Sequence, residues 1–333
     1  MRFKAQIQNI TTFTKFVASL TSLGPVAWVR LNENDVRFTI IPEQGTQVWA
    51  VLAIDAIFEG YTIQSAAENV INLEVPLGPL HQALKSALQA TAASIRLTKK
   101  DNIPLLSITI VRNSIGNARQ SASEDDDGGI GIGLSRERET TITQDVPVRV
   151  LSPSKVEGIH EPRCRDPDVH IILPPLMQLK SISDRFTKVA LESRSVTAGL
   201  SAIGPRLEMA ANMHGCLRLG IKTDAMKMAS LWTGLDNPEL DPSHLEGGME
   251  EIQQHPSTRM KQLGGPDGQS EEGWAKVRLD GKDWGKVMSV GRLGGRVIAC
   301  FCHEHALILY VYLPSERDEE ESALTYYISS YSA

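Results

Sequence analysis

Alternating and helical hydrophobic patterns divide the first half of the chain into short strands and two amphipathic helices. Residues 2–7 alternate between polar and apolar side chains, which is the period of a half-buried strand. Apolar side chains recur every three or four residues over 10–20, so we predict a helix with one buried face that ends at Gly24-Pro25. A second helix is predicted over 79–90. The remaining apolar segments, separated by turn-forming residues, predict strands at 26–31, 36–41, 47–53, 61–63, 70–75, 94–98 and 103–111.

The second half of the chain repeats this order of elements. A strand at 168–173 precedes a helix at 175–186, and a further helix is predicted at 283–292. The other predicted strands lie at 206–212, 216–222, 227–235, 274–279, 296–302, 306–313 and 325–329. Because both halves have the same order of strands and helices, we predict an α+β fold of two similar modules, each packing two helices against one face of antiparallel sheets.

Three segments interrupt the apolar pattern. Residues 113–140 contain an acidic run followed by glycines, and 236–273 are rich in Pro, Gly, Glu and Gln. Both have too little apolar surface to offset chain entropy, so we predict flexible insertions. The proline-rich segment 152–167 is predicted to be the interdomain connector. The expected domains are therefore 1–151 and 168–333.

Composition is that of a globular protein. The 333 residues are 41% hydrophobic and 22% charged, and no stretch approaches the roughly 18 apolar residues that span a bilayer. The opening residues also lack the apolar core of a signal peptide, so we expect no membrane partner and a cytosolic or nuclear location with four reduced cysteines. The formal charge of −6 should repel nucleic acid unless the basic groups gather on one face.

No motif predicts an enzyme, a metal site or a cofactor. The segment Cys300–His305 contains zinc-type ligands, but strand alternation points its cysteines and histidines to opposite faces. The glycines of 128–133 lack the Gly-Lys-Ser/Thr ending of a phosphate loop. Asp166 and Asp168 have no identifiable partner carboxylate. We therefore expect no catalytic residue, no bound metal and no cofactor.

Seven stretches, spread from the N-terminus to the second half of the chain, carry a resemblance to a known family: Met1-Arg2-Phe3-Lys4-Ala5, Phe58-Glu59-Gly60-Tyr61, Glu68-Asn69-Val70-Ile71-Asn72-Leu73-Glu74, Leu84-Lys85-Ser86-Ala87, Ile95-Arg96-Leu97-Thr98-Lys99-Lys100, Asp145-Val146-Pro147-Val148-Arg149-Val150 and Asp166-Pro167-Asp168-Val169. In these residues and in its order of elements, the chain resembles the Hus-type subunit of the heterotrimeric DNA-damage checkpoint clamp, the nine-one-one complex. The similarity runs from Met1 to about Tyr331.

The resemblance implies a fold similar to the replication clamp PCNA, with two domains whose helices line the hole of a ring. It implies as partners two paralogous checkpoint clamp subunits, a clamp loader, encircled double-stranded DNA, and checkpoint and repair proteins, with a location in the nucleus and also in the cytoplasm. The basic side chains on the predicted helices then become the DNA-facing candidates, namely Lys15, Lys85, Lys180, Arg185, Lys188, Lys282 and Lys286. The strand 103–111 becomes the candidate edge for subunit pairing, through Ile103, Leu105, Ser107, Thr109 and Val111.

Alternatives stay open at this point. Each helical lysine is also compatible with an ordinary solvated polar face, and 103–111 is also compatible with an internal strand. A clamp-fold scaffold that binds only proteins, or a homotrimeric replication-type clamp, would share the same pattern.

Overall fold

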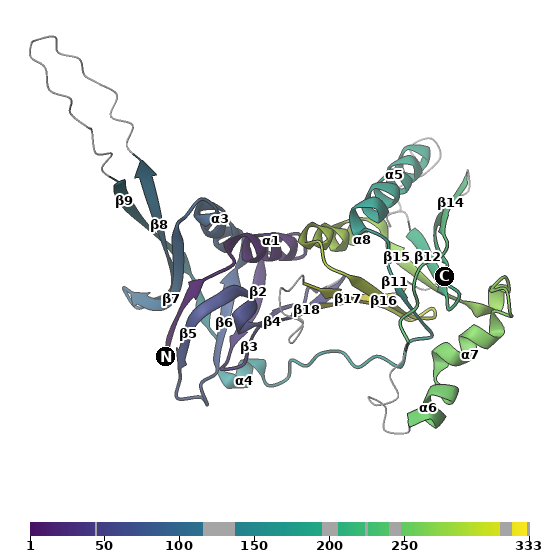
Figure 1. Cartoon of the computed structure of the whole chain (residues 1–333), viewed down its shortest axis with the longest axis horizontal. Helices are drawn as coiled ribbons and strands as arrows, with labels where there is room; N and C mark the ends of the chain where they lie inside the picture. The colour runs from purple at the N-terminus through teal and green to yellow at the C-terminus, as the bar shows by residue number, and fades with distance from the viewer. Residues whose placement is uncertain are drawn as a thin grey trace, which may run out of the picture.

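Two modules of antiparallel sheet lie side by side, with a row of helices along one side of them (Figure 1). The computed structural model describes residues 1–43, 45–115, 137–194, 206–223, 226–239, 248–313 and 322–331. The first module and the segment after it contain β1 (Arg2–Ile7), α1 (Ile10–Thr21), β2 (Val26–Leu31), β3 (Asp35–Ile40), β4 (Gln47–Ala53), α2 (Ile54–Ile57), β5 (Phe58–Gln64), β6 (Ile71–Pro76), α3 (Leu77–Ala87), β7 (Ala92–Lys100), β8 (Ile103–Ile115), β9 (Glu137–Pro147), β10 (Arg149–Val150) and α4 (Pro153–Val156).

The second module has a similar order of strands and helices, but the helices α6, α7 and η2 follow β14, and the single strand β15 stands where the first module has β5 and β6. Its elements are β11 (Val169–Ile172), α5 (Leu176–Arg194), β12 (Arg206–Asn212), β13 (Leu217–Lys222), β14 (Lys227–Trp232), α6 (Gly248–Gln254), α7 (Pro256–Leu263), the 3-10 helix η2 (Glu271–Gly273), β15 (Trp274–Asp280), α8 (Gly281–Val287), the 3-10 helix η3 (Met288–Leu293), β16 (Val297–Cys302), β17 (Ala306–Tyr312) and β18 (Ala323–Ser329).

One sheet joins the two modules. The described strands form a five-stranded sheet in the order β5-β1-β7-β8-β9, a four-stranded sheet in the order β14-β13-β12-β15, and a nine-stranded sheet in the order β10-β6-β2-β3-β4-β18-β17-β16-β11. The modules meet where β4 pairs with β18, from Val51 opposite Ala323 to Gln47 opposite Tyr327. The predicted α+β architecture is confirmed, and the shared sheet makes the two modules one continuous wall.

The helix row is continuous across the junction. Helix α3 packs on α1, α1 packs on η3, and η3 and α8 pack on α5. The side chain of Asn9 caps α1 by accepting from the Thr12 N–H at 3.0 Å, and Asp280 caps α8 by accepting from the backbone N–H groups of Lys282 and Asp283. Helix α5 continues eight residues beyond the predicted end at 186, because Ala190 extends its buried face.

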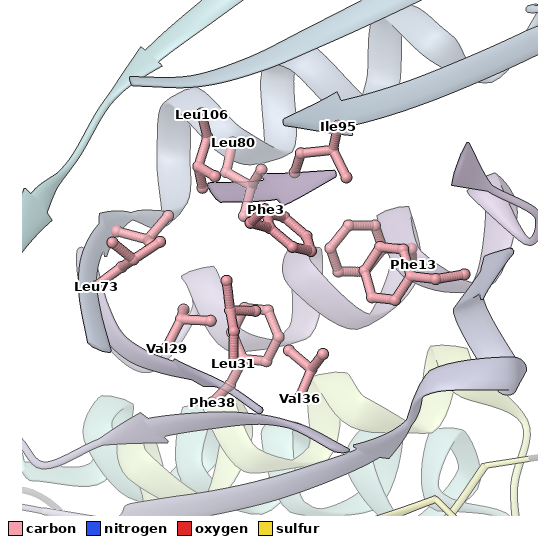
Figure 2. A pocket seen from close by; sticks show the side chains of 12 residues that line it. Phe3, Phe13, Val29, Leu31, Val36, Phe38, Leu73, Leu80, Ile95 and Leu106 are labelled. Atoms are coloured by element: carbon pink, nitrogen blue, oxygen red, sulfur yellow. The ribbon is translucent and has the colours of Figure 1, made fainter. Parts of the chain in front are cut away.

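The core of the first module consists of closely packed apolar side chains. A cavity of about 20 Å³ remains among side chains of α1, α3 and both sheets, which is space for at most one water molecule. Figure 2 shows Phe3 and Phe13 pointing into it from β1 and α1. The ring of Phe38 meets that of Phe16 edge-on with centroids 5.1 Å apart. This hollow is a packing gap and not a ligand pocket.

Both segments predicted as flexible insertions contain ordered structure, so that prediction is wrong in part. Strand β8 extends to Ile115, and strand β9 begins at Glu137. Residues 116–136 lie outside the described residues. Within 236–273, the polar helices α6 and α7 form, and buried His255 caps α7 by accepting from the Ser257 N–H at 3.2 Å. Asn237 anchors the start of this insertion, donating to the His170 carbonyl at 2.7 Å. Residues 240–247 lie outside the described residues.

The segment 152–167 begins with the single turn α4 and then runs extended below the shared sheet to β11 (Figure 1). The carboxylate of Glu161 accepts from the Tyr327 hydroxyl at 2.9 Å, which holds the segment against β18. Its role as the interdomain connector remains a prediction. No helix among the described residues is long and apolar enough to cross a membrane.

Candidate nucleic-acid interface

Positive charge is concentrated on the helix row. Helices α1, α3, α5, α8 and η3 contain nine basic and three acidic residues, a formal charge of +6, whereas the whole chain carries −6. The remainder of the chain is therefore strongly acidic. Such a partition gives one face an affinity for polyanions that the net charge conceals.

The two helices of the first module contribute one exposed lysine each. Lys15 lies on α1 opposite the buried Phe13 and Phe16, and Lys85 lies near the end of α3. Neither helix contains an acidic residue, so nothing on α1 or α3 themselves offsets these charges. Burial, and secondly the charge of Lys85, lower the pKa of His81 from its ordinary value, so His81 is neutral at pH 7.

The second module concentrates its cations in a groove between α5 and the α8–η3 segment. The basic side chains that line this groove are Lys180, Lys188, Lys282, Lys286 and Arg292, and the acidic ones are Asp184 and Glu192. Of the seven predicted DNA-facing residues, the structure brings four together here. Lys15 and Lys85 lie on the neighbouring helices of the row, and Arg185 is exposed on α5 outside the groove.

Ion pairs bind some of these cations to the helices themselves. The Lys180 ammonium donates to Asp184 at 2.9 Å and to the Gly285 carbonyl at 3.3 Å, so it joins α5 to α8. Lys286 donates to Asp283 at 3.1 Å. Lys188 and Lys282 are exposed and have no recorded ion-pair partner among the described residues. These two are therefore the cations most available for an external phosphate.

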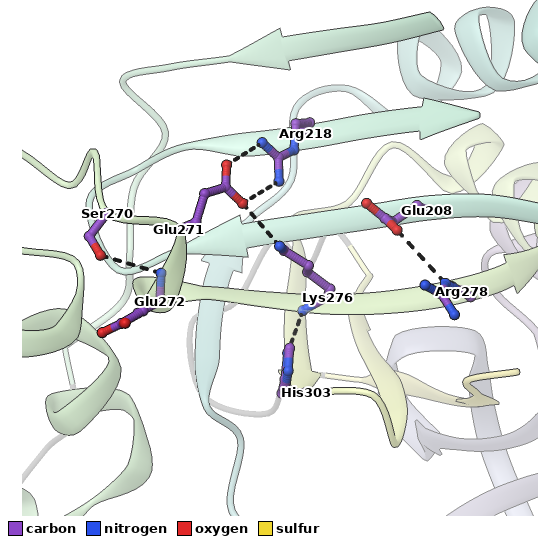
Figure 3. Close-up of polar contacts among 8 residues, drawn as sticks. All are labelled: Glu208, Arg218, Ser270, Glu271, Glu272, Lys276, Arg278 and His303. Carbon is purple, nitrogen blue, oxygen red and sulfur yellow. Dashed lines mark hydrogen bonds and ion pairs between the residues drawn. The ribbon is translucent and has the colours of Figure 1, made fainter. Parts of the chain in front are cut away.

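The opposite side of the second module carries basic side chains that acids already neutralise (Figure 3). Arg218 donates to both carboxylate oxygens of Glu271, at 2.9 and 3.2 Å, and Lys276 donates to the same carboxylate at 3.0 Å. These two cations lower the pKa of Glu271 to about 2. The Nε atom of Arg278 lies 3.8 Å from Oε2 of Glu208. Arg218, Lys276 and Arg278 thus all have acidic partners, whereas Lys188 and Lys282 on the helix row have no ion-pair partner among the described residues.

The predicted edge strand is an internal strand. β8 pairs with β7 on one side and with β9 on the other, so the edge role assigned to Ile103, Leu105, Ser107, Thr109 and Val111 is wrong. The edges of that sheet are β5 and β9, and β9 lies within the part of the chain predicted to be flexible or left unassigned. At the other end of the molecule, β14 is one edge of the four-stranded sheet and exposes Leu231 at 60%.

The cysteine and histidine segment has the character of strand and turn. Burial raises the pKa of Cys300 to about 12 and that of Cys302 to about 11, so both are protonated thiols. His303 lies in the turn after β16, and its Nδ1 accepts from the Lys276 N–H at 3.0 Å. Among the described residues, no group of three His, Cys, Asp or Glu side chains is arranged to hold a metal ion.

Comparison with solved structures defines the class of fold. The chain matches PCNA from Thermococcus kodakaraensis with a TM-score of 0.60 at 13% identity, covering 99% of this chain and 100% of that one. It matches a chain of the PCNA2-PCNA3 complex from Sulfolobus tokodaii with a TM-score of 0.58 at 14% identity, covering 99% of each. The fold is that of a sliding clamp, with two clamp domains.

Comparison of sequences gives the family. The model described as "Hus1-like protein" matches residues 1–332. The checkpoint protein hus1 of Schizosaccharomyces pombe is 39% identical over 99% of both chains. The human checkpoint protein HUS1 is 25% identical over 72% of this chain and 76% of its own length. The chain belongs to the Hus1-like family, and family and fold together define a non-enzymatic checkpoint clamp subunit.

Proposed function

We propose that this chain joins two paralogous checkpoint clamp subunits in a heterotrimeric ring that encircles double-stranded DNA. A clamp loader places the ring on DNA in the nucleus, and the ring then recruits checkpoint and repair proteins. The chain also resides in the cytoplasm. The observation that carries this proposal is the formal charge of +6 on the helix row of a chain whose net charge is −6.

The chemistry of the helix row favours contact with the phosphate backbone of a duplex. Lysine and arginine contacts to phosphates give affinity without sequence information. The described polar surfaces of α1, α3, α5 and α8 present no exposed aromatic ring for base stacking. A ring needs little affinity per contact, because its topology prevents escape.

Two open strand edges, at opposite ends of the molecule, support assembly through edge pairing (Figure 1). Unpaired N–H and C=O groups on β9 and β14 are templates for a strand of another chain. We assign β9 to one neighbouring subunit and β14 to the other. This replaces β8 as the pairing strand.

Charge reversal on the helix row tests the DNA-facing role. In the test variant Lys15, Lys85, Lys188 and Lys286 become glutamate, and Lys180 is kept because it ties α5 to Gly285. The matched control reverses four exposed lysines elsewhere, Lys99, Lys100, Lys155 and Lys261. Assembled rings are loaded on nicked circular DNA and their retention and loading yield are measured.

We expect the test variant to assemble normally but to load poorly, and the control to behave as the unmodified chain. Normal loading of the test variant would contradict the DNA-facing role of these lysines. It would favour the second candidate, a clamp-fold scaffold that binds only proteins and whose helical lysines are merely solvated.

A further inference from the structure

The segment that leaves the first module contains a serine with the surroundings of a phosphate acceptor. Among the 17 prolines of the chain, Pro153 is the only one that follows a serine or threonine. The preceding residue is Ser152, and Lys155 follows three positions after it. From this motif and its structural setting we infer that Ser152 is a phosphorylation site for a proline-directed protein kinase, a regulation beyond the proposed clamp function.

The backbone at Ser152 already has the conformation that such a kinase binds. Ser152 has φ −72° and ψ 152°, which is extended, because the ring of Pro153 disfavours the helical region for the residue before it. Pro153 also has no N–H to leave unpaired in the kinase pocket. Kinases take the acceptor serine in an extended segment, so the site requires no rearrangement at the acceptor itself.

The side chains that a kinase must reach are exposed. Ser152, Pro153, Ser154 and Lys155 all lie at the surface, and α4 buries none of its residues. The Ser152 hydroxyl has one recorded contact, to the Ser154 hydroxyl at 3.0 Å. Lys155 has no recorded ion-pair partner among the described residues, so its ammonium is available to an acidic kinase subsite.

The flanking structure opens at low cost. On one side, β10 has only two residues and lies at the edge of its sheet. On the other side, α4 is a single turn closed by two hydrogen bonds of 3.0 Å, in which the Lys155 N–H donates to the Ser152 carbonyl and the Glu157 N–H donates to the Pro153 carbonyl. Edge strands and single turns are the elements that open locally most often. Figure 1 places α4 across the sheets from the helix row, so this site is open whether or not DNA occupies that row.

The reaction is an ordinary phosphoryl transfer. The kinase supplies Mg²⁺ and ATP, the Ser152 Oγ forms a bond to the γ-phosphorus, the bond from that phosphorus to the β–γ bridging oxygen breaks, and ADP leaves. The hydroxyl proton passes to the catalytic aspartate of the kinase. The product carries about −1.5 to −2 charges at pH 7, three residues from Arg149 on one side and from Lys155 on the other.

The test uses the folded, full-length chain with a cyclin-dependent kinase as the proline-directed enzyme. Sites are assigned by tandem mass spectrometry, and initial rates are measured for the unmodified chain, Ser152→Ala, Ser154→Ala and Lys155→Ala. Ser154→Ala is the matched control, because Ser154 is equally exposed but is not followed by proline. A synthetic peptide spanning residues 147–160 is assayed in parallel, and its rate shows how well the kinase phosphorylates the motif outside the folded chain.

We expect one phosphoryl group on Ser152, none in this segment of Ser152→Ala, and an unchanged rate for Ser154→Ala. Loss of the charged partner in Lys155→Ala should lower kcat/KM on the order of tenfold. The inference is overturned if Ser152→Ala is phosphorylated in this segment as fast as the unmodified chain, or if the peptide is a substrate and the folded chain is not.

Discussion

Two side chains one turn apart on α5 should change DNA affinity in opposite directions. Asp184 and Lys188 both line the groove between α5 and α8, and they are four residues apart on one helical face. If the groove faces phosphates, Lys188→Ala removes an attraction and Asp184→Asn removes a repulsion. If the groove faces only solvent, neither substitution has an effect on DNA binding.

The magnitudes follow from Coulomb's law and counterion release. Neutralising a carboxylate roughly 7 Å from a phosphate in water removes about 0.6 kcal/mol of repulsion, which screening at 0.1 M salt cuts to about 0.3 kcal/mol, or nearly twofold in affinity. Removing one lysine that contacts a phosphate lowers the slope of log K against log salt by about 0.9. The lost pair between Asp184 and Lys180 is half exposed and costs only about 0.3–0.5 kcal/mol of stability.

The assay is fluorescence anisotropy of a short labelled duplex with the purified chain over a salt series. Asp184→Asn should bind more tightly at low salt, and Lys188→Ala should bind more weakly with a shallower slope. Glu59→Gln, an exposed carboxylate on β5 away from the helix row, is the charge-matched control and should bind as the unmodified chain. Equal binding by Asp184→Asn, Lys188→Ala and the unmodified chain would refute the groove as a phosphate contact.

Three further predictions concern stability. Phe16→Ala should lower the free energy of unfolding by about 3–5 kcal/mol in urea melts, because Phe16 is fully buried against Phe38; a loss below about 1 kcal/mol would contradict that packing. Gly215→Ala should destabilise the fold and shift Tm downward in calorimetry, since φ is +73° and an added Cβ would lie 2.4 Å from the Leu235 carbonyl oxygen; an unchanged Tm would contradict this. Burial, and to a smaller degree the charge of His255, lower the folded-state pKa of His170, so its contribution to folding stability is present above pH 6.5 and is lost as pH falls below that value. His170→Gln should therefore flatten the decline in the free energy of unfolding between pH 7 and pH 5. An equally steep decline in this variant would disprove the prediction.

Helix faces were predictable from the sequence and strand edges were not. The apolar spacing of Ile10, Phe13, Phe16, Val17 and Leu20 predicted the buried face of α1. The last four are buried and Ile10 is half-buried. Strand β9 has a half-exposed, threonine-rich sequence with few apolar residues, so its hydrophobic signal is weak. Its pairing with β8, the preceding strand, depends on backbone hydrogen bonds, which sequence periodicity does not report.

The helical insertion escaped prediction for a related reason. Helix α7 buries only Ser257 fully and packs Met260 partly against the core, so it has no continuous apolar stripe. Its position is fixed by polar contacts, such as the Asn212 amide donating to the Gly268 carbonyl at 3.2 Å and the His214 ring contacting the Lys261 carbonyl at 3.2 Å. The groove was foreseeable only in part, because the individual lysines are visible in sequence but the approach of α5 to α8 is tertiary.

The heterotrimeric assembly is tested by the mass of the chain in solution, alone and mixed with the two paralogous clamp subunits, measured by light scattering on a sizing column. We expect a monomer for the chain alone and a one-to-one-to-one complex after mixing. The substitution Thr141→Pro on the edge strand β9 should weaken that complex. A stable homotrimer of this chain would contradict the heterotrimeric ring, and no association with either subunit would contradict the assembly altogether.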